Sequence, residues 1–341
     1  MRVAMTVLPY IEGNLRTAKQ IGVDDIVHNG LPPAPLDYDM LRTEVEKLHR
    51  LELKLTVLEG ALPIDQIVSG GSGRDRQIGE FQRSIEAAGR LGVEVVSYNF
   101  MPQVLNGEMV VRTTFGAPAR GGAQTSAFRL ADVTPATVAH TYESMPEEVM
   151  WDNLEYFLKA VIPIAEQSGV KLAMHPDDPP LSPVCGLNRI MSSVDAFDRL
   201  VSLSPSPVNG ITLCQGCFLE MGADLPDILH RFEERIHFVH FRDIAGVTSD
   251  FVETFPDDGP TDFLSVFNAF KEIGYRGPIR VDHVPRLAIE TGPNDGYGFV
   301  GHVFATGYLK GLIDSVYGKP GVSRWRDIPS EKQAARYVSR V

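Results

Sequence analysis

The stretch KLAMHPDDPP at Lys171–Pro180 shows how the chain is built: a short apolar run ends on a histidine, and a proline-rich loop follows. Seven further apolar or β-branched runs occur, and most precede a segment with helical spacing of apolar residues. Strands that alternate with helices in this way pair in parallel through crossover connections. The predicted strands are Arg2–Val7, Asp25–His28, Lys54–Leu58, Glu94–Asn99, Lys171–His175, Gly210–Cys214, His237–His240 and Pro278–Asp282.

Amphipathic segments between these runs predict helices at Asp39–Leu51, Gln77–Leu91, Trp151–Gln167, Val194–Leu203 and Thr261–Ile273. Eight strand–helix units are what a closed α/β barrel needs, so we expect a (β/α)8, or TIM, barrel. A doubly wound open sheet is the alternative, but the GxGxxG motif that usually follows its first strand is missing. The 341 residues then form one domain, 1–341, because barrels of this size are single units.

The segment between the fourth and fifth predicted strands is much longer than the others. Its extra length includes residues 101–145, with RTTFGAPARGGAQTSAFR at the centre. Long insertions after barrel strands usually form lids or walls over the site, so we predict a lid-like insertion here. A disordered surface loop is the alternative. Residues 319–341 are predicted to be a polar C-terminal extension without a motif.

The composition argues against several classes of protein. A formal net charge of −12 disfavours a nucleic-acid partner, which needs a basic face. No apolar run reaches the roughly 18 residues that span a bilayer. The apolar stretch at the N-terminus is short and has one arginine, so we expect a first strand there and not a secretory signal. Three cysteines fit a reducing compartment better than a disulfide framework, which predicts a cytoplasmic location. A small molecule is the expected partner, and the sequence leaves a homo-oligomer open.

Residues that can bind metal stand at the ends of four successive predicted strands. His175 ends the fifth, Cys214 the sixth, His240 the seventh and Asp282 the eighth. In barrels these ends line one shared mouth. One such residue alone is more often structural, but two imidazoles, a thiolate and a carboxylate together predict a metal site. The Asp177–Asp178 pair is expected to orient His175.

Neighbouring residues compete with these candidates. His237 and His240 are an odd number of positions apart, so only one faces the barrel interior, and His240 lies nearer the C-terminal edge. His283 follows the last strand and can turn over the mouth. The CxxC formed by Cys214 and Cys217 could be a redox pair or half a zinc site. Because no second CxxC exists, we expect Cys214 to be a ligand and Cys217 to pack.

Five longer strings carry a family resemblance. They are SYNFMP at Ser97–Pro102, WDNLEYFLKAVIPIAEQSGVKLAMHPDDPP at Trp151–Pro180, SPVNGITLCQGC at Ser206–Cys217, RIHFVHFRD at Arg235–Asp243 and GYRGPIRVDH at Gly274–His283. Over most of its length the chain resembles the mannonate dehydratases, metal-dependent barrels of the xylose-isomerase-like type. The resemblance implies a hydro-lyase of hexuronate catabolism that converts D-mannonate to 2-keto-3-deoxy-D-gluconate.

The resemblance also implies roles for individual residues. The family's metal ligands fall on the same four strand-end residues, and its usual ion is Mn²⁺, although the donor set also suits Zn²⁺ and leaves Fe²⁺ open. Two residues linked to catalysis in the family match His283 and Tyr297. From its place at the end of the fourth strand, Asn99 is expected to contact a substrate hydroxyl, with a structural amide as the alternative.

Some positions near the predicted site depart from the family pattern. Val284-Pro285 replaces a glycine, Cys217 replaces a serine, and His302 replaces an arginine, while VVRTT at Val110–Thr114 lacks a tryptophan. Val284, Pro285, His302 and the altered insertion are expected to lie where the distal hydroxyls of a substrate are recognised. Two rival functions follow: a metal-dependent epimerase or isomerase on the same barrel, and a catalytically silent sugar-acid binding protein.

Overall fold

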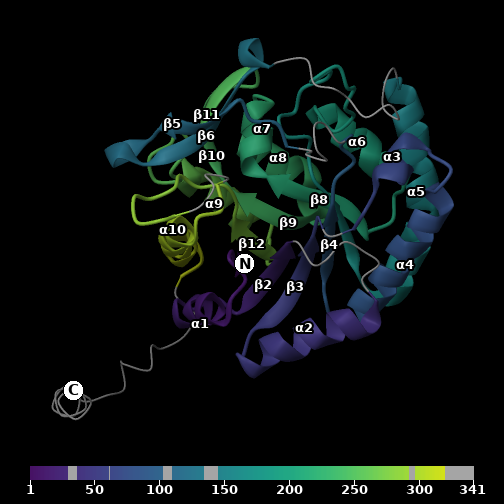
Figure 1. Cartoon of the computed structure of the whole chain (residues 1–341), viewed down its shortest axis with the longest axis horizontal. Coiled ribbons are helices and arrows are strands. Elements are labelled where there is room, and N and C mark those ends of the chain that lie inside the picture. Colours follow the sequence, from purple (N-terminus) through teal and green to yellow (C-terminus); the bar gives the residue numbers. More distant parts are fainter. Residues whose placement is uncertain (30–36, 61, 103–109, 134–144, 292–295, 319–341) are drawn as a thin grey trace.

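The computed structural model describes residues 1–29, 37–60, 62–102, 110–133, 145–291 and 296–318. Eight parallel strands close into a barrel in the order β1-β12-β9-β8-β7-β4-β3-β2 (Figure 1). The predicted (β/α)8 fold is confirmed, and each predicted strand overlaps an observed one. The strands are β1 (Arg2–Thr6), β2 (Asp25–Asn29), β3 (Lys54–Glu59), β4 (Val95–Tyr98), β7 (Lys171–Met174), β8 (Asn209–Cys214), β9 (Ile236–Phe241) and β12 (Pro278–Val281).

Helices surround the barrel, and the five predicted ones are confirmed as α2, α4, α5, α6 and α9. None of the described helices combines the length and apolar character that crossing a bilayer requires. The helices are α1 (Glu12–Gln20), α2 (Tyr38–Arg50), α3 (Asp65–Ser69), α4 (Arg74–Arg90), α5 (Glu147–Ser168), α6 (Val194–Leu203), α7 (Gln215–Glu220), α8 (Leu225–Phe232), α9 (Phe263–Glu272) and α10 (Phe299–Tyr317).

Helix α2 shows how the local sequence produces this layer. Asp37 caps its N-terminus by accepting the backbone N–H of Met40 at 2.8 Å. Leu41, Val45 and Leu48 follow at a spacing of four and three residues and are buried against the core. One face of the helix is therefore apolar, and its burial holds the helix against the barrel.

The interior of the barrel is packed with side chains. An apolar cluster of six residues from six strands fills it: Ala4, Val27, Val57, Val95, Ala173 and Phe238. All six are at most 1% exposed, and burying a large apolar side chain contributes roughly 1.5–3 kcal/mol. Because the interior is filled, the barrel is not a pore, and a ligand site has to lie at its mouth.

A second, antiparallel sheet is built from two loops of the barrel. Its strands are β5 (Thr114–Pro118), β6 (Gln124–Arg129), β10 (Asp243–Val247) and β11 (Asp250–Thr254), in the order β10-β11-β6-β5 (Figure 1). Strands β5 and β6 belong to the insertion after β4, whereas β10 and β11 follow β9. The β10–β11 hairpin was not predicted from the sequence, because only β11 shows even a short alternation of more buried and more exposed residues.

The predicted lid is described only in part. Residues 103–109 and 134–144 of the insertion, and the whole C-terminal extension 319–341, lie outside the described residues. Met101 and Val110, which flank the first of these segments, line the pocket discussed below. The insertion therefore reaches the site, and its closing over the site stays a prediction.

Candidate metal centre and active site

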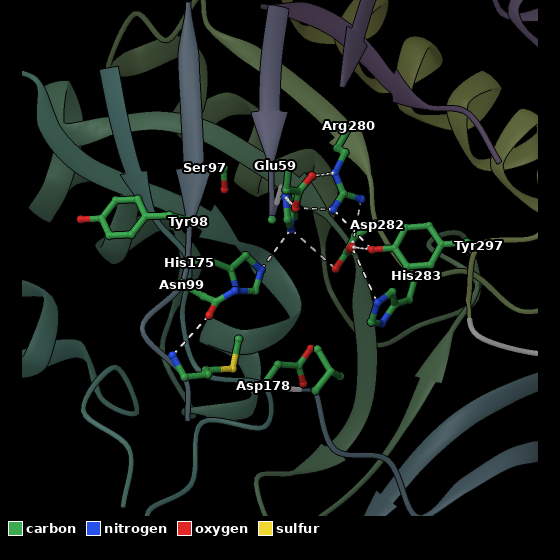
Figure 2. Close-up of a pocket in the computed structure, with 14 residues that line it drawn as sticks. Glu59, Ser97, Tyr98, Asn99, His175, Asp178, Arg280, Asp282, His283 and Tyr297 are labelled. Carbon is green, nitrogen blue, oxygen red and sulfur yellow. Dashed lines mark hydrogen bonds and ion pairs between the residues drawn. The ribbon is translucent and has the colours of Figure 1, made fainter. Parts of the chain in front are cut away.

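A polar pocket lies at the C-terminal mouth of the barrel, where β3, β4, β7, β9 and β12 end (Figure 2). Its lining includes three of the four predicted metal ligands, both predicted catalytic residues and the predicted substrate contact. These are His175, His240, Asp282, His283, Tyr297 and Asn99. Residues that are far apart in the sequence are thus brought together as the strand-end reasoning expected.

The four predicted ligands form a compact cluster. Cys214 is fully buried, and its Sγ lies 3.8 Å from Asp282 Oδ2. His240 Nδ1 lies 3.7 Å from the same oxygen and 3.2 Å from His175 Nε2. Donor atoms bound to one ion at about 2.0–2.3 Å are roughly 3–4 Å apart, so Cys214, His240 and Asp282 have the spacing and the donor types of a single metal site. His175 forms a second group with Cys214 and Cys217, and the two groups share Cys214. Their assignment as ligands remains a prediction.

The two cysteines of the CxxC differ in charge and surroundings, and both are free. Cys214 precedes the first residue of α7, and Cys217 lies in the first turn of that helix. Burial raises a thiol pKa, but at Cys214 the hydrogen bond from Cys217 and the charge of Arg242 outweigh it and hold the pKa well below its usual value. Burial and the neighbouring Cys214 raise the pKa of Cys217 well above the usual range. The surroundings therefore favour the thiolate, the form that binds metal, at Cys214 and not at Cys217.

Arg242 explains why a glycine, Gly216, stands between the two cysteines of the CxxC. Its guanidinium is fully buried beneath the cluster and donates to Cys217 Sγ at 3.6 Å and to the Glu220 carboxylate. A Cβ at Gly216 would collide with this guanidinium. Glycine is thus required so that the helix can pass close to Arg242. Cys217 also lies with His175 and Cys214 in a group whose donor atoms could hold a metal, so its expected packing role stays a prediction.

Glu59 and Arg280 are site residues that the sequence analysis missed. Arg280 donates two hydrogen bonds to Glu59, from Nε at 2.9 Å and from Nη2 at 2.7 Å (Figure 2). Glu59 Oε1 also lies 2.9 Å from His240 Nε2. Burial alone would raise the pKa of Glu59, but the charges of Arg280 and His240 hold it well below its usual range. The signal was present, because Glu59 follows directly on Leu58, where the predicted strand ended.

The two predicted catalytic residues meet at the carboxylate of Asp282. Tyr297 Oη donates to Asp282 Oδ1 at 3.1 Å, and His283 Nε2 lies 3.9 Å from that oxygen (Figure 2). The rings of His283 and Tyr297 stand edge to face, with centroids 5.1 Å apart. Burial and the charge of Asp282 raise the pKa of Tyr297 well above its usual value. At His283, burial lowers the pKa, but Asp282 and Glu253 outweigh it and raise the pKa.

Asn99 is used partly by the fold itself. Its Oδ1 accepts the backbone N–H of Met101 at 3.2 Å, which stabilises the turn after β4. Because the residue also lines the pocket, its amide N–H groups are the donors that it can offer to a substrate.

The expected role of the aspartates after His175 was wrong. His175 Nδ1 lies 2.7 Å from the carbonyl oxygen of Pro176. Asp178 binds Arg112 at 2.6 Å and Arg242 at 2.8 Å instead, because these buried guanidinium groups need a counter-charge. Asp177 accepts the backbone N–H of Met191 at 2.7 Å, so neither carboxylate bonds the imidazole.

Two of the unusual residues lie behind the pocket and not in its lining. His302 is buried, and its ring stacks on Tyr297 with centroids 5.6 Å apart and a 13° angle. Its Nδ1 lies 2.9 Å from the carbonyl oxygen of Gly298. Val284 is also fully buried. The expectation that these two side chains lie where substrate hydroxyls are recognised was therefore wrong, since His302 reaches the site only through Tyr297.

A closed (β/α)8 barrel with such a cluster at its C-terminal mouth defines a barrel enzyme. A sequence model of the D-mannonate dehydratase (UxuA) family matches residues 12–140 and 129–320. Mannonate dehydratase 1 of Halalkalibacterium halodurans is 33% identical over 332 residues, which cover 86% of this chain and 90% of that protein. The chain therefore belongs to the D-mannonate dehydratase family, whose members are hydro-lyases.

Solved structures agree with this membership. The mannonate dehydratase from Streptococcus suis serotype 2 superposes with a TM-score of 0.85 at 27% identity, covering 95% of this chain and 99% of that one. A xylose isomerase domain protein from Planctomyces limnophilus shares the fold, with a TM-score of 0.58 at 13% identity over 94% of this chain and 98% of its own. The family resemblance seen in the sequence is confirmed.

Proposed function

We propose that the protein removes water from D-mannonate, or from a closely related sugar acid, and forms a 2-keto-3-deoxy acid. For D-mannonate the product is 2-keto-3-deoxy-D-gluconate. The observation that carries the proposal is that the ligand cluster and the pair His283 and Tyr297 meet at one carboxylate, that of Asp282. A cytoplasmic location and a homo-oligomer stay predictions.

We propose Mn²⁺ as the ion, with Zn²⁺ and Fe²⁺ as alternatives. Its ligands would be the strand-end cluster of His175, Cys214, His240 and Asp282. The carboxylate and a chelating sugar acid suit Mn²⁺, while the thiolate and imidazoles are softer donors. When bound, the ion supplies Lewis-acid stabilisation for the negative charge that develops beside the substrate carboxylate.

The protein's own groups would move the protons. His283 takes the C2 proton of the substrate as general base. Tyr297 gives a proton to the 3-hydroxyl, so that the C3–O bond breaks and water leaves. Because burial and Asp282 raise the pKa of Tyr297 above its usual value, the phenol carries that proton at neutral pH. The resulting enol then gains a proton at C3 and loses the proton of its C2 hydroxyl, which leaves the 2-keto group. Asp282 holds Tyr297 by a 3.1 Å hydrogen bond, and Asn99 would donate to a substrate hydroxyl.

The test is a screen of aldonic acids with added Mn²⁺ for 2-keto-3-deoxy products. We expect D-mannonate to be dehydrated, and His283→Ala to lower turnover by about 10²-fold or more with the metal content unchanged. Loss of metal in His283→Ala, or normal turnover, would overturn the role of His283. If fully metal-loaded wild-type protein dehydrates no aldonate, the lyase proposal fails. Epimerisation without water loss would then support the epimerase, and binding without turnover the silent binding protein.

A further inference from the structure

Glu253 is the centre of a buried charge cluster that connects the second sheet to His283. The residue lies on β11 and is fully buried. Its Oε1 lies 2.7 Å from His283 Nδ1 and accepts a hydrogen bond from Arg112 Nη2 at 2.7 Å. Its Oε2 accepts from Ser126 Oγ. Arg112 and Ser126 both belong to the insertion after β4, so the insertion and the β10–β11 hairpin converge on one carboxylate beside His283.

The two ring nitrogens of His283 have different surroundings. Glu253 is held between Arg112 and Arg242, the latter at 3.5 Å, so its carboxylate is ionised and can only accept hydrogen bonds. His283 Nδ1, at 2.7 Å, therefore carries the proton that Glu253 accepts. Arg242 Nη1, which can only donate, also lies 3.3 Å from Nδ1 and would need Nδ1 as an acceptor, but the shorter contact at 2.7 Å to the ionised Glu253 favours the proton on Nδ1. Nε2 is the nitrogen on the side of Asp282 and the pocket.

We propose that Glu253 is a positioning residue for the dehydration. It holds the imidazole of His283 in the Nδ1–H tautomer and leaves Nε2 as the atom that takes the C2 proton. This inference rests on the proposed function, because it requires His283 to exchange a proton with the substrate. Glu253 is not part of the described pocket lining or of the ligand cluster, so it acts on the substrate through His283. A histidine whose second nitrogen donates to a carboxylate is fixed in tautomer and in ring orientation.

The neighbours of Glu253 allow variants to distinguish its role in orienting His283 from the effect of its side-chain volume. His283 Nδ1 and the two arginines can only donate, whereas the Ser126 hydroxyl can also accept. In Glu253→Gln the amide NH2 can face Ser126 while the carbonyl oxygen still accepts from Nδ1. Glu253→Ala removes the acceptor altogether. Ser126→Ala is the matched control, because it removes one contact of the carboxylate and leaves the contact with His283 intact.

The kinetic experiment uses these three variants in the metal-loaded protein, with the best aldonate of the screen. We expect Glu253→Ala to lower kcat by about 10²-fold, with KM within about 3-fold of wild type and the metal content unchanged. The kcat of Glu253→Gln should be at least about 10-fold higher than that of Glu253→Ala. The kcat of Ser126→Ala should stay within about 3-fold of wild type. Normal kcat in a folded Glu253→Ala, or no recovery in Glu253→Gln, overturns the positioning role.

A second readout needs neither turnover nor a variant of Glu253. Nitrogen-15 NMR of the wild-type protein loaded with diamagnetic Zn²⁺ reports which imidazole nitrogen is protonated, and His283→Ala identifies the His283 signals by their loss. We expect Nδ1 to be protonated. A proton on Nε2 of neutral His283 overturns the inference, even if Glu253→Ala fails to fold. If the wild-type protein dehydrates no aldonate but shows protonated Nδ1, the proposed function fails while the tautomer assignment holds.

Discussion

Glu59 offers a sharp test of the ligand cluster, because it contacts a predicted ligand without being one. Its Oε1 accepts from Arg280 Nη2 at 2.7 Å and lies 2.9 Å from His240 Nε2, while Oε2 accepts from Arg280 Nε at 2.9 Å. Glu59→Gln keeps the shape of this side chain but replaces one acceptor by an N–H donor and removes the charge. Because Oε1 is the oxygen that lies close to both Arg280 Nη2 and His240 Nε2, we expect the amide oxygen to take its place, so that the contact with His240 survives in weakened form.

The size of the effect follows from this geometry. Loss of a carboxylate that orients a ligand histidine typically costs about 10- to 100-fold in metal affinity, or about 1.4–2.7 kcal/mol. We expect Glu59→Gln to weaken Mn²⁺ binding by about 10-fold, because one acceptor for His240 remains. Glu59→Ala removes both acceptors and should reach about 100-fold. Arg280 keeps Asp282 at 3.0 Å as its counter-charge in both variants, which favours folding.

The assay is a titration of metal-free protein with Mn²⁺ in competition with a chelating indicator. His237→Asn is the matched control, because His237 is buried on the same strand as His240 but bonds the carbonyl oxygen of Leu172 at 3.0 Å, away from the cluster. The Mn²⁺ affinity of His237→Asn should equal that of wild type. Wild-type affinity in both folded Glu59 variants would refute the role given to Glu59. If His175→Ala also binds normally, the cluster is not the metal site.

Three further predictions concern metal content, the cysteines and pH. Elemental analysis should find roughly one divalent ion per chain, and His175→Ala should lose most of it; full retention contradicts the ligand assignment. Cys217→Ser should keep metal and activity while Cys214→Ser weakens metal binding, and the reverse pattern would exchange their roles. Burial lowers the pKa of His237 to about 4, so between pH 6.5 and 4 the folded protein binds fewer protons than the unfolded chain. As the pH falls from 7 to 5, this residue should therefore lower the free energy of unfolding by about 2 kcal/mol. Urea unfolding at both pH values should show that His237→Asn loses less unfolding free energy than wild type. An equal loss in the two proteins would refute the lowered pKa of His237.

The sequence alone determined the barrel and the ends of its strands. Alternating strand and helix patterns are local, so all eight barrel strands could be predicted, as could five of the ten described helices. Strand ends in a parallel barrel share one mouth. It followed that His175, Cys214, His240 and Asp282 would meet, although they come from four different strands. The hairpin β10–β11 was missed because its alternation is short and three of the five residues of β10 are exposed.

Only the tertiary structure decided which charged groups meet around that mouth. Arg280 and Glu59 are 221 positions apart, and Arg112 and Glu253 are 141 apart. The sequence pattern does not show which charged residues pair, because the pattern is the same for a charged side chain that faces water and for one that faces a buried partner. Barrel closure places Glu59 against His240, and the pairing of β6 with β11 places Glu253 within reach of Arg112. The ligand types are thus local information, whereas their orientation and charge depend on contacts that exist only once the chain has folded.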